Sequence, residues 1–129
     1  MKEIIKPALE RGDIVICDRF IDSSIVYQGY GRKLGEHVEM INEFAIDGYM
    51  PDITFLFKLK PEIAKSRIKI SNRDRLESEQ AGFYDEVFKG YIELEKRYPD
   101  RIIGIDASRN IQEIHTEIRE RLEAILHDV

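Results

Sequence analysis

Short continuous apolar runs alternate along this chain with segments whose apolar residues recur every three or four positions. The runs at residues 14–17, 52–57 and 102–105 have the length and continuity of strands buried in a parallel sheet. Helical spacing fills the intervals between them, and crossover helices lie on both faces of such a sheet. The pattern therefore predicts an α/β fold built on a parallel sheet.

The helical segments are marked by their periodicity and by the residues at their ends. Gly12 and Gly48 are expected to end helices, and Pro61 to open one, because a proline at the first helical position loses no hydrogen bond. Pro7 weakens the first helix, since an interior proline does lose one. The segment at about 70–80 is charged without a sustained period and predicts a mobile loop or lid. The expected helices cover residues 2–11, the stretch through Ile25 and Tyr27, 38–46, a helix from Pro61, 83–98 and 111–125.

Composition places the chain among folded globular domains and argues against several function classes. With 129 residues, 43% of them hydrophobic and 35% charged, it has the size of one domain with one core. The net charge of -5 argues against a nucleic-acid binder, which needs a basic surface. No apolar run approaches the roughly 18 residues of a membrane span, and the first residues lack the apolar segment of a signal peptide. The single cysteine, Cys17, fits a reducing compartment, so we expect a cytoplasmic protein without nucleic-acid or membrane partners.

Asp18 and Arg19 directly follow the first predicted strand and are the main candidates for chemistry. Lys58 and the pair Asp106-Ala107 follow the other two strands, and parallel α/β sheets bind ligands beyond the carboxyl ends of their strands. We therefore expect these residues to converge. The arginine can hold phosphate oxygens with two hydrogen bonds, and the aspartate can orient it or act through a metal-bound water. A structural salt bridge or a strand-end cap explains the pair about equally well.

Two serines, a tyrosine and a glutamine follow shortly afterwards. Tyr27 and Gln28 lie four positions after Ser23 and Ser24, so all four can face one side of a helix. The Gln28 amide offers both a donor and an acceptor, which suits the edge of a base. The alternatives are that a serine caps the helix and that Tyr27 belongs to the core.

Basic residues gather between positions 65 and 75, where only Asp74 is acidic. A lid that closes over a transferring phosphoryl group would use such guanidinium groups, whereas the ordinary interpretation is a solvated helix end. The three histidines are far apart in the sequence, and neither a metal-ligand spacing nor a Ser-His-Asp or Cys-His triad is readable. The basic residues are Lys65, Arg67, Lys69, Arg73 and Arg75.

Taken in order, several of these segments resemble thymidylate kinase, especially the bacterial form. They are PALERGDIVICDRF at 7–20, DSSIVYQGYGR at 22–32, INEFAIDGYMPDITFLF at 41–57, RDRLE at 73–77, FYDEVFKGY at 83–91 and IDA at 105–107. The resemblance implies a P-loop NTPase fold of the nucleoside monophosphate kinase type. It also implies transfer of the γ-phosphoryl group of ATP to thymidine monophosphate (dTMP) with Mg²⁺, and a homodimer formed through helices, for which residues 37–47 are the candidate.

The same resemblance assigns roles to single residues. Arg19 would bind the acceptor phosphate, supported by Asp18, which could also reach the metal through a water molecule. Arg73 and Arg75 would be lid arginines that contact the transferring phosphate. Ser23, Ser24, Tyr27 and Gln28 would line the thymidylate pocket, and Arg67 with Asp106, Ala107 and Ser108 would flank the adenine.

One family element is missing from this sequence, the phosphate-binding P-loop of the form G-x-x-x-x-G-K-[ST]. No glycine here is followed by lysine. We therefore expect a single partial domain, 1–129, that lacks the N-terminal strands, including the central strand between 14–17 and 53–57. Direct pairing of those two strands, exchange with another chain, or a partner segment would close the gap.

Without that cradle we expect little kinase activity from the chain alone, because phosphoryl transfer depends on positioning and charge neutralisation. The alternative is a non-catalytic remnant of the kinase fold that dimerises and binds nucleotide weakly or not at all. A third interpretation is a related nucleotide kinase with a different acceptor, which the Tyr27-Gln28 pair disfavours.

Overall fold

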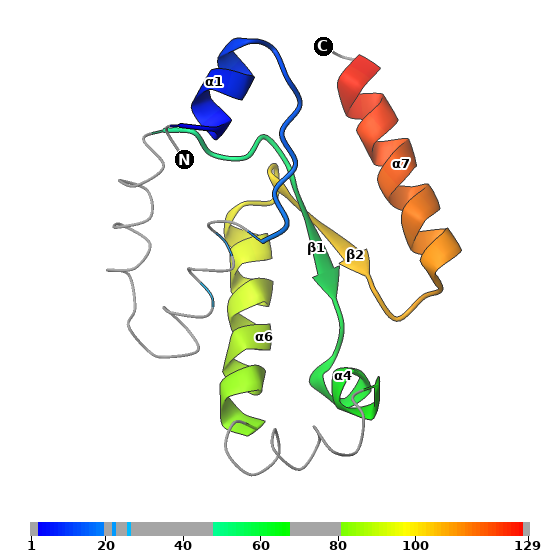
Figure 1. Cartoon of the computed structure of the whole chain (residues 1–129). Coiled ribbons are helices and arrows are strands. Elements are labelled where there is room, and N and C mark those ends of the chain that lie inside the picture. The colour runs from blue at the N-terminus through cyan, green and yellow to red at the C-terminus, as the bar shows by residue number, and fades with distance from the viewer. Residues whose placement is uncertain (1–2, 20–21, 23–25, 27–47, 68–80, 128–129) are drawn as a thin grey trace.

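The computed structural model describes residues 3–19, 22, 26, 48–67 and 81–127 (Figure 1). In the part after residue 48 each strand is followed by helix, as the periodicity predicts. The elements are α1 (Ile5–Glu10), β1 (Thr54–Lys58), α4 (Pro61–Arg67), α6 (Ala81–Arg97), β2 (Ile102–Asp106) and α7 (Ile111–His127).

The sheet of the described residues consists of β1 and β2, which run parallel with Thr54 opposite Ile102. The Thr54 N–H donates to the carbonyl of Arg101 at 2.8 Å, so the backbone groups of Thr54 face β2. In a parallel strand the N–H and C=O of one residue point to the same side, and successive residues alternate sides. The backbone groups of Phe55 and Phe57 therefore face the outer edge of β1, away from β2.

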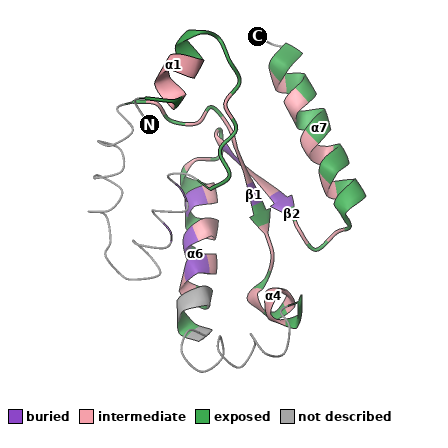
Figure 2. Cartoon of the chain, in the orientation of Figure 1, coloured by how far each residue is buried: buried purple, intermediate pink, exposed green. Residues whose placement is uncertain are grey.

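The core forms where α6 packs against the sheet (Figure 2). Val87 and Leu94 belong to the apolar stripe that predicted this helix, and both are buried. Each fully buried aliphatic side chain stabilises the fold by about 1.5–3 kcal/mol relative to an exposed one. Among the described residues the buried apolar side chains are Val26, Leu56, Val87, Leu94, Ile102 and Ile105.

The ends of the helices follow the expected local chemistry. Pro61 is the first residue of α4, and α6 ends two residues before Pro99. Gly12 ends the turn after α1 with a φ of +83°, and Gly48 has a φ of +80°, both in the left-handed region that suits glycine. Helix α1 begins three residues later than the predicted start at residue 2, and none of its side chains is buried.

The prediction of a strand at residues 14–17 was wrong. The structure assigns no strand to this run, in which Ile14 and Ile16 are 71% and 89% exposed. A strand requires a neighbour for its backbone groups, and the sheet of the described residues pairs β1 with β2 only. Direct pairing of this run with β1, one of the three expected ways to close the gap, is therefore not what the structure shows.

Helix α7 runs on the opposite side of the strand pair from α6 (Figure 1). It was predicted from its apolar stripe, yet none of its side chains is buried. A search of the described residues finds no helix that is both long and apolar enough to cross a membrane.

Candidate functional site

The carboxyl ends of β1 and β2 meet at one corner of the sheet, where Lys58 lies opposite Asp106 in the strand register. The carbonyl of Lys58 accepts a hydrogen bond from the Ala107 N–H at 3.0 Å, which extends the pairing one residue beyond β2. Ser108 then donates to one oxygen of the Asp106 carboxylate through its backbone N–H at 2.9 Å and its hydroxyl at 2.6 Å. The chain therefore turns sharply after β2 around a fixed carboxylate.

The same hydrogen bonds set the charge of this corner. The Ser108 hydroxyl, and next the Ser108 backbone N–H, lower the pKa of Asp106 because both stabilise the ionised carboxylate. Asp106 is thus charged at neutral pH, and its side chain orients the turn that presents the 107 and 108 carbonyls.

Arg67, the last residue of α4, reaches this corner from another part of the chain. Its guanidinium donates to the carbonyl oxygens of Ala107 and Ser108 at 3.3 and 3.4 Å. The structure thus brings Arg67 together with the 106–108 turn, the residues that the resemblance assigns to the adenine, and that role stays a prediction. Both contacts are long and exposed, so a ligand can compete for the guanidinium at little cost.

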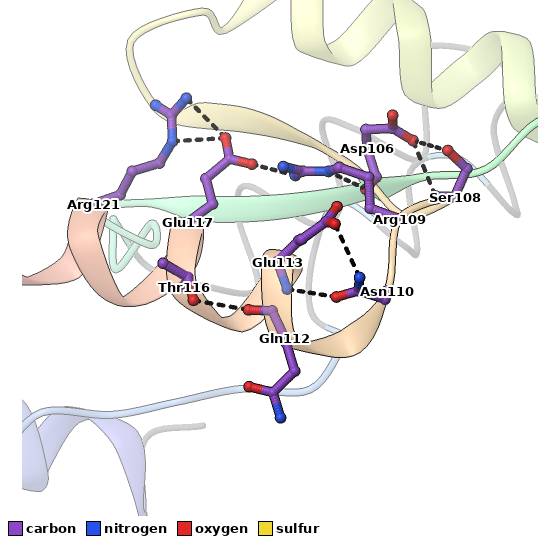
Figure 3. A network of polar contacts seen from close by, with 9 residues as sticks. All are labelled: Asp106, Ser108, Arg109, Asn110, Gln112, Glu113, Thr116, Glu117 and Arg121. Atoms are coloured by element: carbon purple, nitrogen blue, oxygen red, sulfur yellow. Dashed lines mark hydrogen bonds and ion pairs between the residues drawn. The ribbon is translucent and has the colours of Figure 1, made fainter.

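Helix α7 is attached to the corner through polar contacts (Figure 3). The Arg109 guanidinium donates to the Asp106 carbonyl at 3.2 Å and pairs with Glu117, which also binds Arg121 at 3.1 Å. The hydrogen bond from Arg109 lowers the pKa of Glu117, and the same bond raises the pKa of Arg109. A hollow beside this network is lined by Arg109, Gln112, Glu113, Thr116, Glu117 and Glu120.

That hollow does not suit a phosphate group. Glu113, Glu117 and Glu120 line it, and an excess of carboxylates repels anions. Asn110 caps α7 there: its side-chain oxygen accepts from the Glu113 N–H at 2.9 Å, and its amide donates to the Glu113 carboxylate at 2.9 Å. This network was not predicted from the sequence, although Asn110-x-x-Glu113 and the Glu117–Arg121 spacing are recognisable signals.

A second ion pair that was not predicted lies on the α6 side of the sheet. The Lys58 ammonium is 3.2 Å from the Glu95 carboxylate, and both side chains are about one-third exposed or less. Gly104 makes room for this pair, because a Cβ atom there would lie 2.4 Å from a Glu95 oxygen and 2.8 Å from Lys58 Cε. Lys58 is therefore engaged with α6, so it does not extend toward the corner as a free cation.

The segment that contains Asp18 and Arg19 takes a different course. Asp22, three residues further on, is buried at the amino ends of the strands. Its carboxylate binds the Arg101 guanidinium at 2.7 and 2.9 Å, and Arg101 also donates to the Thr54 hydroxyl at 3.1 Å.

The convergence of Asp18 and Arg19 with Lys58 and Asp106 stays a prediction. The Asp22–Arg101 ion pair itself lies at the amino ends of the strands, at the opposite end of the sheet from Lys58 and Asp106. Its hydrogen bond to Asp22 raises the pKa of Arg101, so the pair stays ionised. Arg19 has a φ of 64°, an uncommon value for a residue with a side chain.

Comparison with known proteins shows the family to which the chain is related. A sequence profile described as Thymidylate kinase matches residues 1–118. Thymidylate kinase from an Exiguobacterium species is 48% identical over 92% of this chain and 57% of that protein. Thymidylate kinase from Geobacillus thermodenitrificans is 51% identical over 89% of this chain and 53% of that protein. This chain belongs to the thymidylate kinase family.

A solved structure extends the relationship to the fold. The crystal structure of thymidylate kinase from Ehrlichia chaffeensis matches with a TM-score of 0.69 at 34% identity. The match covers 94% of this chain and 55% of that chain. The predicted fold class, a partial α/β fold of the P-loop nucleoside monophosphate kinase type, is confirmed. The chain spans about half the length of the thymidylate kinases it matches.

Several residues assigned by the resemblance lie outside the described residues. They belong to the expected thymidylate pocket and to the expected lid, so their roles stay predictions. In the described part of the chain, no group of three or more His, Cys, Asp or Glu side chains is placed to hold a metal ion. The residues outside it are Ser23, Ser24, Tyr27, Gln28, Arg73 and Arg75.

Proposed function

We propose that this chain supplies the acceptor side and the adenine corner of a thymidylate kinase, which phosphorylates dTMP to dTDP with ATP for dTTP synthesis. The observation that carries the proposal is the contact of Arg67 with the Ala107 and Ser108 carbonyls in a chain of this family. These groups lie at the carboxyl ends of the strands, where parallel α/β sheets bind their ligands.

The chemistry of the corner supports binding of an adenine ring. Backbone carbonyls such as those of Ala107 and Ser108 accept hydrogen bonds from an exocyclic amino group. The planar guanidinium of Arg67 can leave its long hydrogen bonds and stack on the face of the ring. Asp106 keeps the turn in place, since its carboxylate is already engaged by Ser108.

The phosphate side of the site is proposed from the family pattern. Arg19 binds the phosphate of dTMP with support from Asp18, Arg73 and Arg75 close over the transferring group, and the thymidylate pocket is formed by Ser23, Ser24, Tyr27 and Gln28. A Mg²⁺ ion neutralises charge on the ATP phosphates when it is bound. Asp18 would act on that ion through a water molecule.

The chain alone is proposed to have little kinase activity, because its sequence contains no P-loop. A second candidate is a non-catalytic remnant of the kinase fold that binds nucleotide weakly. The two-stranded sheet of the described residues and the exposed run at 14–17 support this candidate. A homodimer and a cytoplasmic location complete the proposal, the latter supported by the single cysteine.

Calorimetric titration of the chain with a non-hydrolysable ATP analogue, and separately with dTMP, tests the assignments. We expect Arg67→Gln to weaken binding of the ATP analogue about two- to fivefold, the worth of one exposed stacking contact, and to leave dTMP binding unchanged. Arg119→Gln is the matched control, because Arg119 is an exposed arginine on α7 with only an i,i+4 ion pair. Loss of dTMP binding alone in Arg67→Gln would refute the adenine assignment. Absence of binding by either nucleotide would favour the remnant.

A further inference from the structure

The turn after β2 offers hydrogen-bond acceptors to a ligand, because two of its donors are engaged within the chain. The Ala107 N–H donates to the carbonyl of Lys58 at 3.0 Å. The Ser108 N–H donates to the Asp106 carboxylate at 2.9 Å. The carbonyls of Ala107 and Ser108 both contact the guanidinium of Arg67, so they face the same side. A group that replaces the guanidinium there must therefore be a donor.

This arrangement distinguishes between the two purine bases. The exocyclic amino group of adenine is a donor, whereas guanine carries an acceptor oxygen at the same position. Guanine would place that oxygen against two carbonyl oxygens, and the engaged N–H groups cannot turn to meet it without breaking their own hydrogen bonds. A site discriminates strongly against a ligand that leaves its polar groups unpaired. The turn therefore favours adenine for as long as its conformation is held.

An arginine and a glutamate hold this turn from the side of helix α7 (Figure 3). The Arg109 Nε donates to the Asp106 carbonyl at 3.2 Å, and a terminal nitrogen of the same guanidinium pairs with Glu117. Arg121 binds the other oxygen of the Glu117 carboxylate at 3.1 Å and fixes it in turn. Because the guanidinium is a rigid fork that joins two acceptors, the position of the Asp106 carbonyl depends on α7.

We propose that Arg109 and Glu117 are positioning residues for the recognition of adenine, a role that rests on the function proposed above. By holding the Asp106 carbonyl they keep the next two carbonyls directed at the amino group of the base. Glu117 acts through Arg109, and Arg109 acts through the backbone of the turn. Loss of either side chain lets the turn rotate and present an N–H to an acceptor, so the preference for adenine over guanine decreases.

Calorimetric titration with non-hydrolysable analogues of ATP and GTP measures this preference. We expect the wild-type chain to bind the ATP analogue about tenfold more tightly, the usual effect of one mismatched hydrogen-bonding group. In Glu117→Gln and in Arg109→Gln, binding of the ATP analogue should weaken about threefold while binding of the GTP analogue stays the same. Glu123→Gln is the matched control, because it removes an exposed carboxylate of α7 from an i,i+4 pair with Arg119 at 3.7 Å. It should change neither affinity.

Amide hydrogen exchange gives a second readout that needs no nucleotide. The Ser108 N–H is protected by its hydrogen bond to the Asp106 carboxylate. We expect its exchange to become about threefold faster in Glu117→Gln and to stay unchanged in Glu123→Gln. Slow exchange of the amides in the middle of α6 shows that each variant keeps its fold.

The outcomes separate this role from the proposed function. A wild-type chain that binds the two analogues equally overturns the adenine preference and leaves the proposed function standing. Equal weakening of both analogues in Glu117→Gln, or unchanged exchange of the Ser108 N–H, would show that the ion pair attaches α7 without positioning the turn. A wild-type chain that binds neither analogue overturns the proposed function and the positioning role together.

Discussion

The two ends of the β1–β2 pair are built from different kinds of interaction. At the carboxyl ends, Asp106 and Ser108 are neighbours in sequence, and their hydrogen bonds are exposed. At the amino ends, Asp22, Thr54 and Arg101 come from three distant segments and form a network in which the ion pair is mostly buried. The exposed end can change partners when a ligand arrives, whereas the buried end acts as an anchor.

The largest effect is expected at the anchor. Arg101→Met removes the partner of the Asp22 carboxylate, which is only 7% exposed, and leaves a buried charge unpaired. Such a loss costs about 3–5 kcal/mol of the free energy of unfolding. Urea denaturation of the variant and the wild-type chain measures the difference.

Two further variants sharpen this prediction. Arg119→Met removes an exposed arginine with an ion pair at 3.7 Å and should change stability by less than about 0.5 kcal/mol. Thr54→Val removes only the hydroxyl that shares the network and should have an intermediate effect. A loss below about 1 kcal/mol in Arg101→Met would show that the amino end is no anchor.

A smaller effect is expected at the carboxyl end. Asn110→Ala removes the cap of α7, whose oxygen accepts from the Glu113 N–H at 2.9 Å. Loss of an N-cap costs about 1 kcal/mol, and Gln112→Ala, which changes an exposed neighbour without a cap role, should cost less. Circular dichroism during thermal unfolding compares the two. If Asn110→Ala destabilised the chain as strongly as Arg101→Met, the contrast between the two ends would be wrong.

The smallest expected effect is a dependence of folding stability on acidic pH, caused by carboxylates near the carboxyl ends of the strands. The pKa values of Asp106 and Glu117 are lowered from the ordinary 3.8 and 4.5, so these carboxylates stabilise the fold above those values. That contribution is lost as the pH falls through the lowered pKa values, below about 4. We expect the unfolding midpoint of Glu117→Gln to respond less to pH 3 than that of the wild type, with Glu120→Gln as control. An identical response would argue against the Arg109–Glu117 contact.

Local signals in the sequence predicted the part of the fold that depends on local chemistry. The stripe of α6, the proline that opens α4 and the apolar run of β2 are all confirmed. The strand at 14–17 was wrong because a strand requires a neighbour, and an apolar run does not reveal whether one is present. The Asp22–Arg101 ion pair was not predicted, since these two residues are 79 positions apart in the sequence.

The candidate site likewise contains contacts that were expected from the sequence and placements that the sequence could not give. Arg67 and the 106–108 turn, which the family resemblance assigns to the adenine, are in contact although they are 40 residues apart; their role toward the adenine stays a prediction. Asp18 and Arg19 were expected at the same edge because they follow an apolar run, and this placement stays a prediction. Asp22 nearby is bound to Arg101 at the other end of the strands. A rule about strand ends cannot place a residue whose strand has not formed.

Formation of ADP from ATP, Mg²⁺ and dTMP tests the central claim most directly, that this chain is part of a thymidylate kinase site in need of a phosphate cradle. The chain is assayed alone and after addition of the part of the Geobacillus relative that it does not match. We expect little ADP from the chain alone and dTMP-dependent ADP formation from the mixture, where the added part alone gives none. Turnover by the chain alone at the rate of the intact relative, or no activity from a mixture shown to associate, would contradict the account.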